Sequence, residues 1–398
     1  MNRTYDIVLF GATGFTGGLV ADYLALASRR EPLRWAIAGR NRDKLAAVQA
    51  RLAAIDGVTP PVLLVAEVDD ATALAEMAVA TTVVITTVGP YAQLGAALVQ
   101  ACAESGTHYV DLCGEPQFVW RMRKRWDETA RYHGARIVNS CGFESIPPDI
   151  GVLYTVNLLR QRLGEAGWAG AKVRVQGGVE AGGGMSGGTW QSAVGAMSRP
   201  LALLRSQPLP TLASLAPPLR REPRWQRWAV RVPTIDPEVV RHSARLRGSD
   251  YGRLFAYQHY FLSRKLWPIA AGAAAIGGVF TLAQFGPTRR WLLKQKPAGE
   301  GPGADARAKG WFRLNFIAEA EEVSVQTVVT GGDPGYGDSA KMLAEAALCL
   351  ALDRGLPKAA GVITPAAAMG EALIPRLERA GIVFAELPVA ERLGGAKQ

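Results

Sequence analysis

The chain has 398 residues, 48% of them hydrophobic, so it is long enough for two domains with a buried core in each. This composition excludes an intrinsically disordered chain. The net charge is +10, and the stretch 199–265 alone holds 13 Lys and Arg against 4 Asp and Glu. Such a local basic excess indicates an anionic partner, such as membrane lipid, nucleic acid or an acidic carrier protein, or else a solvated surface.

Cysteine and histidine spacing indicates neither a disulfide framework nor a metal site. The four cysteines have no C-x-x-C spacing, and the four histidines form no H-x-x-x-H pair. No charged segment with a following apolar stretch precedes the first predicted strand, so we expect no signal peptide. We therefore predict a cytoplasmic protein with reduced thiols and no metal.

A glycine turn near the N-terminus predicts a dinucleotide site. An apolar strand over 6–10 enters a G-x-x-G-x-x-G turn, and a helix follows from residue 18. Gly11 would let the chain leave the strand, Gly14 would admit a pyrophosphate, and Gly17 would let helix and strand pack closely. The phosphates would lie at the helix N-terminus. The residues predicted to bind are Gly11, Ala12, Thr13, Gly14, Phe15, Thr16 and Gly17.

The end of the second predicted strand, 34–38, favours a phosphorylated dinucleotide. A protein that binds NAD usually has an acidic residue here, which binds the ribose hydroxyls. This chain has Arg40, Asn41 and Arg42 instead, with Lys44 close behind. Cations suit a 2′-phosphate, so we predict NADP(H), with Arg40, Asn41 and Arg42 among its contacts. The alternative is a helix start with incidental arginines.

Strands and helices then alternate as far as residue 140. Further short apolar strands are expected at 61–66, 83–88, 109–112 and 136–140, with helices between them. This alternation predicts a Rossmann-type doubly wound parallel sheet. Asp69 or Asp70 would cap the helix that begins at 71, and Asp69 is also a candidate contact for the adenine amino group.

Beyond residue 143 the pattern changes to that of a second, mixed α/β domain. A helix over 150–163 and a strand over 171–179 lead to a glycine-rich loop at 182–188. The stretch 199–260 shows no clear periodicity, whereas 311–330 reads as two strands and helices follow at 339–353 and 367–380. We predict an NADP-binding domain over 1–143, a substrate- or lipid-facing domain over 144–332, and C-terminal helices over 333–398 that pack back on the first domain.

Residues 266–285 form an uncharged run of 20 residues with cations on both flanks. Its length suits a spanning helix, but Ala and Gly dominate it and contribute little insertion energy. A helix lying at an anionic membrane surface and a small-residue helix buried in a domain or homodimer core are the two main alternatives. We expect peripheral membrane contact through 266–285 and the basic 199–265 region, at the inner face of the plasma membrane, and no nucleic acid.

Several motifs resemble those of the saccharopine dehydrogenase-like oxidoreductases, most closely the branch of trans-acting enoyl reductases. They span nearly the whole chain, at 11–17, 38–41, 89–91, 109–115, 142–149, 332–336 and 361–368. The resemblance implies an NADP-binding Rossmann domain, a mixed α/β second domain, and lipid or membrane association for this branch.

Candidate catalytic residues follow the predicted strands, because ligands of such sheets bind at the strands' carboxyl ends. Gly89 and Pro90 would lie under the cofactor, where Pro90 would stiffen the loop. Tyr91 is a candidate proton donor or a structural aromatic, and Glu144 is a candidate acid or base or a loop hydrogen-bonding residue. Cys141 is more simply a small buried residue than a nucleophile, since no histidine is nearby in the sequence.

We therefore expect an NADPH-dependent oxidoreductase that reduces an enoyl or keto group of a lipid-like substrate. An amino-acid or polyamine-type dehydrogenase that acts on an imine is the alternative enzyme, and a non-catalytic NADP-binding scaffold at a lipid surface is the alternative class. A short-chain dehydrogenase is disfavoured, because no tyrosine is followed four residues later by lysine.

Overall fold

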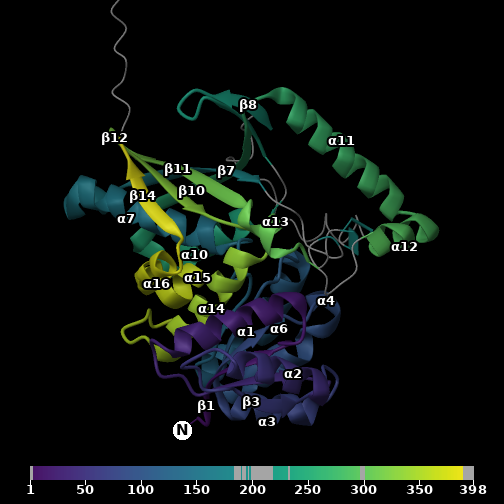
Figure 1. The fold of residues 1–398 in the computed structure, drawn as a ribbon. Coiled ribbons are helices and arrows are strands. Elements are labelled where there is room, and N and C mark those ends of the chain that lie inside the picture. Colours follow the sequence, from purple (N-terminus) through teal and green to yellow (C-terminus); the bar gives the residue numbers. More distant parts are fainter. Residues whose placement is uncertain are drawn as a thin grey trace, which may run out of the picture.

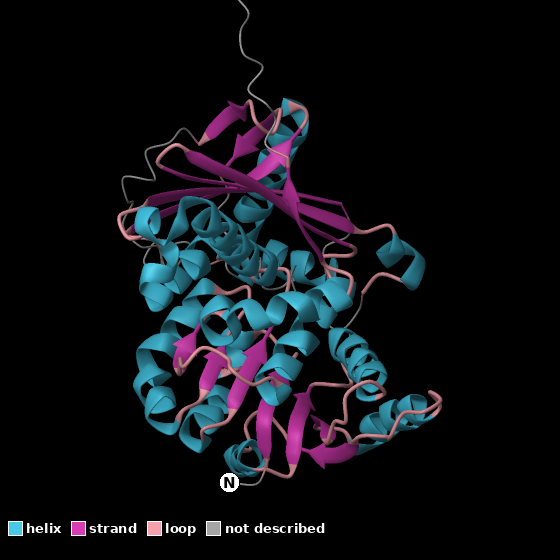
Figure 2. Ribbon diagram, turned by 90° about the vertical axis from the view of Figure 1, so that its left-hand side faces the viewer, coloured by secondary structure: helices cyan, strands magenta, loops and turns pink. Residues whose placement is uncertain are grey.

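The computed structural model describes residues 3–182, 218–231, 234–295 and 301–388, with residues 190, 194–195 and 197–198 between the first two ranges. The predicted glycine-rich loop lies outside the described residues from 183 onward, as does the stretch 199–217. Two sheets lie at opposite ends of the molecule with helices between them (Figure 2).

The N-terminal sheet is parallel throughout and has the strand order β13-β6-β5-β4-β1-β2-β3. Its strands are β1 (Tyr5–Phe10), β2 (Trp35–Gly39), β3 (Val62–Val65), β4 (Thr81–Thr86), β5 (His108–Asp111), β6 (Arg136–Val138) and β13 (Gly361–Ile363). The strand order reverses between β1 and β4, the place where doubly wound sheets bind dinucleotides. The predicted Rossmann-type sheet is therefore confirmed, with one added strand from the C-terminal part of the chain.

Helices cover both faces of this sheet, because its central strands are apolar on both sides. Four consecutive residues of β1, from Ile7 to Phe10, are buried. The covering helices are α1 (Phe15–Ser28), α2 (Arg42–Ala53), α3 (Ala71–Val79), α4 (Tyr91–Leu94), α5 (Ala96–Ser105), α6 (Pro116–His133) and α14 (Gly337–Leu352).

The second sheet is mixed, with the order β14-β12-β11-β7-β10-β9-β8. Only the pair of β7 and β10 is parallel among its described pairings. Its strands are β7 (Lys172–Gly182), β8 (Leu219–Glu222), β9 (Arg227–Val230), β10 (Leu254–Ser263), β11 (Trp311–Ala320), β12 (Val323–Gly331) and β14 (Val383–Leu387). The predicted mixed α/β second domain is thus present.

The layer between the sheets joins the two halves. Its helices are α7 (Ile146–Trp168), α10 (Asp236–Arg247), α15 (Pro365–Met369) and α16 (Leu373–Arg379), with the short 3₁₀ turns η2 (Gly248–Tyr251) and η3 (Gly370–Ala372). Helix α7 packs on β11 and β12, whereas α14 packs on α1, β4 and β5. The C-terminal part, predicted only as helices, also supplies β13 to the first sheet and β14 to the second.

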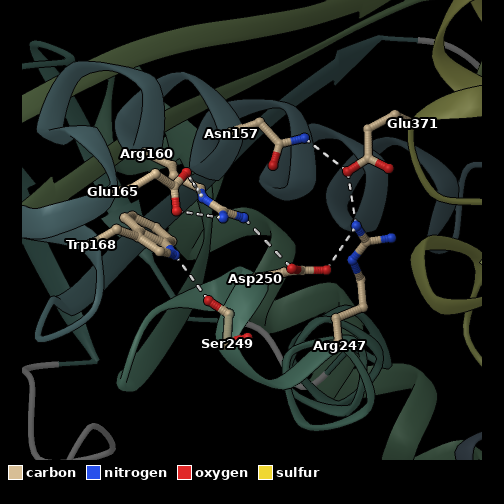
Figure 3. A network of polar contacts seen from close by, with 8 residues as sticks. All are labelled: Asn157, Arg160, Glu165, Trp168, Arg247, Ser249, Asp250 and Glu371. Carbon is tan, nitrogen blue, oxygen red and sulfur yellow. Dashed lines mark hydrogen bonds and ion pairs between the residues drawn. The ribbon is translucent and has the colours of Figure 1, made fainter.

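Polar contacts connect helix α7 and helix α10 with the turns η2 and η3 (Figure 3). Arg160 pairs with Glu165 at 2.8 Å and with Asp250 at 3.7 Å. Arg247 pairs with Asp250 at 3.1 Å and with Glu371 at 2.8 Å. Arg247, Asp250 and Glu371 also line a surface pocket of about 520 Å³, where their charges are already paired.

Two further helices extend away from the body of the molecule (Figure 1). They are α11 (Leu266–Ala283) and α12 (Gly286–Gln295), and the short α13 (Ala304–Ala308) precedes β11. Within α11 only Ala283 is buried. Helix α11 is long and apolar enough to cross a membrane by length and composition alone. The predicted alternative of a helix buried in the core of this chain is therefore wrong.

Candidate functional site

The fingerprint loop has the geometry that a pyrophosphate requires. Gly11 leaves β1 with a φ of +98°, a conformation that L side chains rarely adopt. A Cβ on Gly17 would lie 2.1 Å from the Gly11 carbonyl oxygen, so only glycine allows this contact between α1 and the loop. Helix α1 begins at Phe15 with Gly14 as its N-cap and no side-chain cap. The N–H groups of its first turn therefore remain available for an anion.

The end of β2 lies beside this loop. Thr13 Oγ1 is 4.0 Å from the position that a Cβ on Gly39 would take. Arg40 and Arg42, which follow, are exposed, and neither pairs with a carboxylate in the described part of the chain. Asn41 caps α2, because its Oδ1 accepts a hydrogen bond of 2.9 Å from the Lys44 backbone N–H. The two arginines stay free for a phosphate, while the Asn41 side chain is already engaged.

We expect Arg40→Asp to weaken NADPH binding by ~1–3 kcal/mol, which is about 5- to 150-fold, because a charge-assisted hydrogen bond to phosphate is lost. NADH binding should change much less. Isothermal titration with both nucleotides measures the ratio, and Arg354→Asp on an exposed loop is the control. Wild-type preference for NADH, or an unchanged ratio in Arg40→Asp, would contradict this assignment.

Asp70, rather than Asp69, caps helix α3. The Asp70 carboxylate accepts a 3.0 Å hydrogen bond from the Ala73 backbone N–H and caps α3. Asp69 is exposed at the carboxyl end of the sheet and makes no hydrogen bond to a described side chain. The contact of Asp69 with adenine stays a prediction. Because Asp70 caps α3, the Asp69 side chain is available for that contact.

Gly89 and Pro90 follow β4, and Tyr91 begins the short helix α4. The Tyr91 hydroxyl donates to the Thr86 carbonyl at 3.2 Å and accepts from the Leu112 backbone N–H at 3.2 Å. Burial raises the pKa of this phenol well above its ordinary value. The hydroxyl thus ties the ends of β4 and β5 together, and this geometry favours the structural role over proton donation.

Asp111, which the sequence interpretation did not single out, organises the ends of β5 and β6. Its Oδ1 accepts hydrogen bonds from the backbone N–H groups of Cys113 at 2.9 Å and Ser140 at 2.8 Å. Its Oδ2 accepts from Tyr109 at 2.8 Å and Asn139 at 2.7 Å. Burial nevertheless raises its pKa to about 6. The position of Asp111, an acidic residue at the end of a predicted buried strand, was the feature of the sequence that could have identified it.

Glu144 lies in the loop after β6 with one carboxylate oxygen unpaired. Its Oε2 is buried and has no hydrogen-bond partner among the described residues. Burial, together with the charges of Asp111 and Asp236, raises the pKa of Glu144 to about 8, against a hydrogen bond from its own backbone N–H that lowers it. A carboxyl group in this environment carries a proton at neutral pH, and a protonated Oε2 can donate it.

A second set of buried polar groups, on α10 and β10, lies close enough for one of its members, Asp236, to act electrostatically on Glu144. Asp236, at the start of α10, is 4.0 Å from His259 Nε2, and His259 Nδ1 is 2.7 Å from the Tyr257 hydroxyl. Burial raises the pKa of Asp236 and lowers that of His259. No sequence motif linked these residues, because α10 and β10 lie in the stretch without clear periodicity.

Cys141 is fully buried, and its thiol contacts the Val138 carbonyl oxygen at 3.4 Å. Burial raises its pKa well above the ordinary value, so the reactive thiolate is disfavoured. The interpretation of Cys141 as a small buried residue is the one the structure supports.

Comparison with known proteins agrees with this site. Residues 7–132 match the family model described as the saccharopine dehydrogenase NADP binding domain. A putative trans-acting enoyl reductase of Mycobacterium tuberculosis is 36% identical over 96% of this chain and 97% of its own length. The saccharopine dehydrogenase-like oxidoreductase of Homo sapiens is 30% identical over 98% and 99%.

Among solved structures, apo saccharopine dehydrogenase (L-Glu forming) from Saccharomyces cerevisiae covers 96% of this chain and 99% of its own, with a TM-score of 0.54 and 14% identity. That likeness shows a shared fold. The family assignment comes from the relatives that are 30–36% identical over nearly the whole of both chains. The protein belongs to the saccharopine dehydrogenase-like oxidoreductases and binds NADP(H).

Proposed function

We propose that this protein uses NADPH to reduce an enoyl or keto group of a lipid-like substrate, with Glu144 as the proton donor. The observation that carries the proposal is the buried, unpaired Oε2 of Glu144 at the carboxyl edge of the nucleotide-binding sheet. The relatives named trans-acting enoyl reductase support the same reaction class.

The mechanism assigns one task to each group. When bound, NADPH supplies the hydride. Glu144 holds a proton below pH about 8 and donates it to the developing anion of the substrate. Asp111 orients the backbone around this point by accepting hydrogen bonds from the N–H groups of Cys113 and Ser140. The arrangement therefore provides a proton donor at the carboxyl edge of the nucleotide-binding sheet.

The charges near Glu144 favour this substrate class over an amino acid. An imine formed from an amino acid carries a carboxylate, which requires a fixed cation in the site. The charged groups that act on Glu144 among the described residues are the carboxylates of Asp111 and Asp236. They would repel a second carboxylate, whereas an enoyl or keto group is neutral.

NADPH oxidation with defined acceptors tests the proposal. We expect turnover with trans-2-dodecenoyl thioester or 2-dodecanone and none with the cyclic imine Δ1-pyrroline-2-carboxylate. Turnover with the imine alone would overturn the substrate class. Tight NADPH binding without NADPH oxidation by any acceptor would overturn the proposed reductase activity and favour a non-catalytic NADP-binding scaffold.

We further propose that α11 lies on an anionic membrane surface at the cytoplasmic face, which brings the site close to a lipid substrate. Trp267 is 68% exposed and Ile276 is 57% exposed, and Phe285 just beyond the helix is 62% exposed. Arg264 and Lys265 precede the helix, and Arg289, Arg290 and Lys294 follow it. Apolar side chains between cations suit an interfacial helix.

We expect the protein to float with vesicles that contain phosphatidylserine at low salt and to be released at high salt. The triple variant Leu266→Ser, Ile276→Ser and Phe280→Ser should bind at least about 100-fold more weakly, because each side chain contributes about 1.5 kcal/mol or more when it is buried. Vesicle flotation measures both effects.

A second triple variant, Leu26→Ser, Val79→Ser and Leu254→Ser, removes equally exposed apolar side chains elsewhere and should float like the wild type. Absence of flotation under all conditions would overturn the membrane proposal. A homodimer that dissociates only in the α11 variant, seen by analytical ultracentrifugation, would instead assign α11 to a subunit interface.

A further inference from the structure

One aromatic side chain of the fingerprint loop is enclosed by distant parts of the chain. Phe15, the first residue of α1, meets the Tyr336 ring edge-on with centroids 4.8 Å apart. The Arg307 guanidinium carbon lies 5.5 Å from the centroid of the Phe15 ring. A Cβ on Gly301 would lie 2.3 Å from Phe15 Cε1, so the backbone there passes directly against the ring. Helix α13 and the loop between β12 and α14 thus meet at the nucleotide loop.

The loop that carries Tyr336 is held in place by its own hydrogen bonds. The Asp333 carboxylate accepts from the backbone N–H groups of Gly335 at 3.1 Å and Gly337 at 3.0 Å. Ser339 Oγ donates to the Pro334 carbonyl at 2.7 Å and accepts from the Phe143 backbone N–H at 3.1 Å. The ring of Tyr336 is therefore a fixed support for Phe15, and Phe15 in turn is a fixed platform for Arg307.

Arg307 has unused donors at this position. One of its N–H groups donates to the Pro302 carbonyl at 2.8 Å. It forms no ion pair with a carboxylate in the described part of the chain, and both oxygens of the nearby Asp333 already accept from backbone N–H groups. A guanidinium has five N–H donors in a planar fork that matches phosphate oxygens.

We propose that Arg307 binds the pyrophosphate of NADP(H) together with the first turn of α1. The cation and the unpaired backbone N–H groups of that turn both favour an anion at the same place, next to Phe15. A cation–π contact with Phe15 keeps the guanidinium there at low entropic cost. Arg307 is therefore a cofactor-binding residue, and this role does not depend on the substrate.

Isothermal titration tests the assignment without a substrate. Arg307→Ala should weaken the binding of NADPH and of NADH by the same factor, about 10- to 100-fold, because both nucleotides carry the pyrophosphate. The NADPH/NADH ratio should not change, in contrast to Arg40→Asp. Arg307→Lys should restore part of the affinity, since the charge remains but the fork is lost.

Two further variants complete the design. Lys309→Ala removes an exposed cation two residues away and should bind NADPH like the wild type. Phe15→Leu keeps an apolar side chain but removes the platform, so it should lose affinity with Arg307 intact. Unchanged affinity in Arg307→Ala, with a wild-type melting temperature, would overturn the proposal. A changed NADPH/NADH ratio would also overturn it, because Arg307 would then contact the 2′-phosphate.

Discussion

Glu144→Gln should lower turnover by about 100- to 10,000-fold, the usual contribution of a positioned general acid. Gln has nearly the same shape as Glu but no proton to donate at neutral pH. NADPH affinity should stay close to that of the wild type, because Glu144 lies beyond the fingerprint loop. Steady-state kinetics with the best acceptor from the panel, together with isothermal titration of NADPH, measures both quantities.

The pH dependence follows from the raised pKa. Glu144 has a pKa of about 8 and is the donor only when protonated. Turnover should therefore be full well below pH 8 and fall about tenfold per pH unit above it. The residual activity of Glu144→Gln should show no such fall. The free energy of unfolding should also fall as the pH rises. The folded protein binds this proton more tightly than the unfolded chain, so the stability that Glu144 contributes is lost between the ordinary glutamate pKa and about pH 8.

Infrared difference spectroscopy gives a readout that needs no substrate. Asp111 and Asp149 also lose protons between pH 6 and pH 9.5, so the carbonyl band of protonated carboxyl groups should decrease in both proteins. The decrease should be larger in the wild type than in Glu144→Gln, by the contribution of Glu144. Glu104→Gln, at an exposed position, is the control for both experiments. Turnover of Glu144→Gln within threefold of the wild type would remove Glu144 from the mechanism.

Arg376→Met should lower the free energy of unfolding by about 3–5 kcal/mol, because it leaves the buried carboxylate of Glu345 without its cation. Arg376 on α16 is buried and pairs with Asp353 at 2.6 Å, Glu31 at 2.8 Å and Glu345 at 3.1 Å. Glu345 is itself fully buried and accepts a 2.6 Å hydrogen bond from the Tyr23 hydroxyl of α1. This cluster joins the C-terminal helices to the nucleotide-binding domain.

Urea unfolding followed by circular dichroism measures the change as a shift of the transition midpoint. Arg379→Met, three residues along and exposed, should lower the free energy of unfolding by no more than about 1 kcal/mol, the range of surface ion pairs. Equal stability of Arg376→Met and the wild type would show that the carboxylates find other partners or bind protons. NADPH binding should protect both variants by mass action.

Prediction from the sequence succeeded where the signal is local. A buried parallel strand is a short apolar run, so the strands of the first sheet could be predicted from the sequence. The cofactor loop could be predicted because its three glycines have a fixed spacing. The stretch 199–260 could not be read this way. It contains β8, β9, α10 and most of β10, whose pairing depends on β7 and on each other.

The candidate site shows the same division. Gly11 and Gly17 have roles that one turn determines, and the structure gives each the expected geometry. The state of a titratable side chain depends instead on what surrounds it. The Tyr91 hydroxyl is engaged by β4 and the end of β5, whereas Glu144 Oε2 is left unpaired, and the spacing of these residues does not distinguish the two.

The Rossmann-type sheet, the NADP loop and the uncharged helix can be predicted from the amino-acid sequence, because each depends on residues close together in the chain. The surroundings of these elements depend on how the chain folds in three dimensions. The tertiary structure leaves α11 exposed, buries the unpaired Oε2 of Glu144 near the carboxylates of Asp111 and Asp236, and brings Arg307 to Phe15 across almost 300 residues of chain. The physical reason is that solvation and charge depend on neighbours in space, which local periodicity does not record.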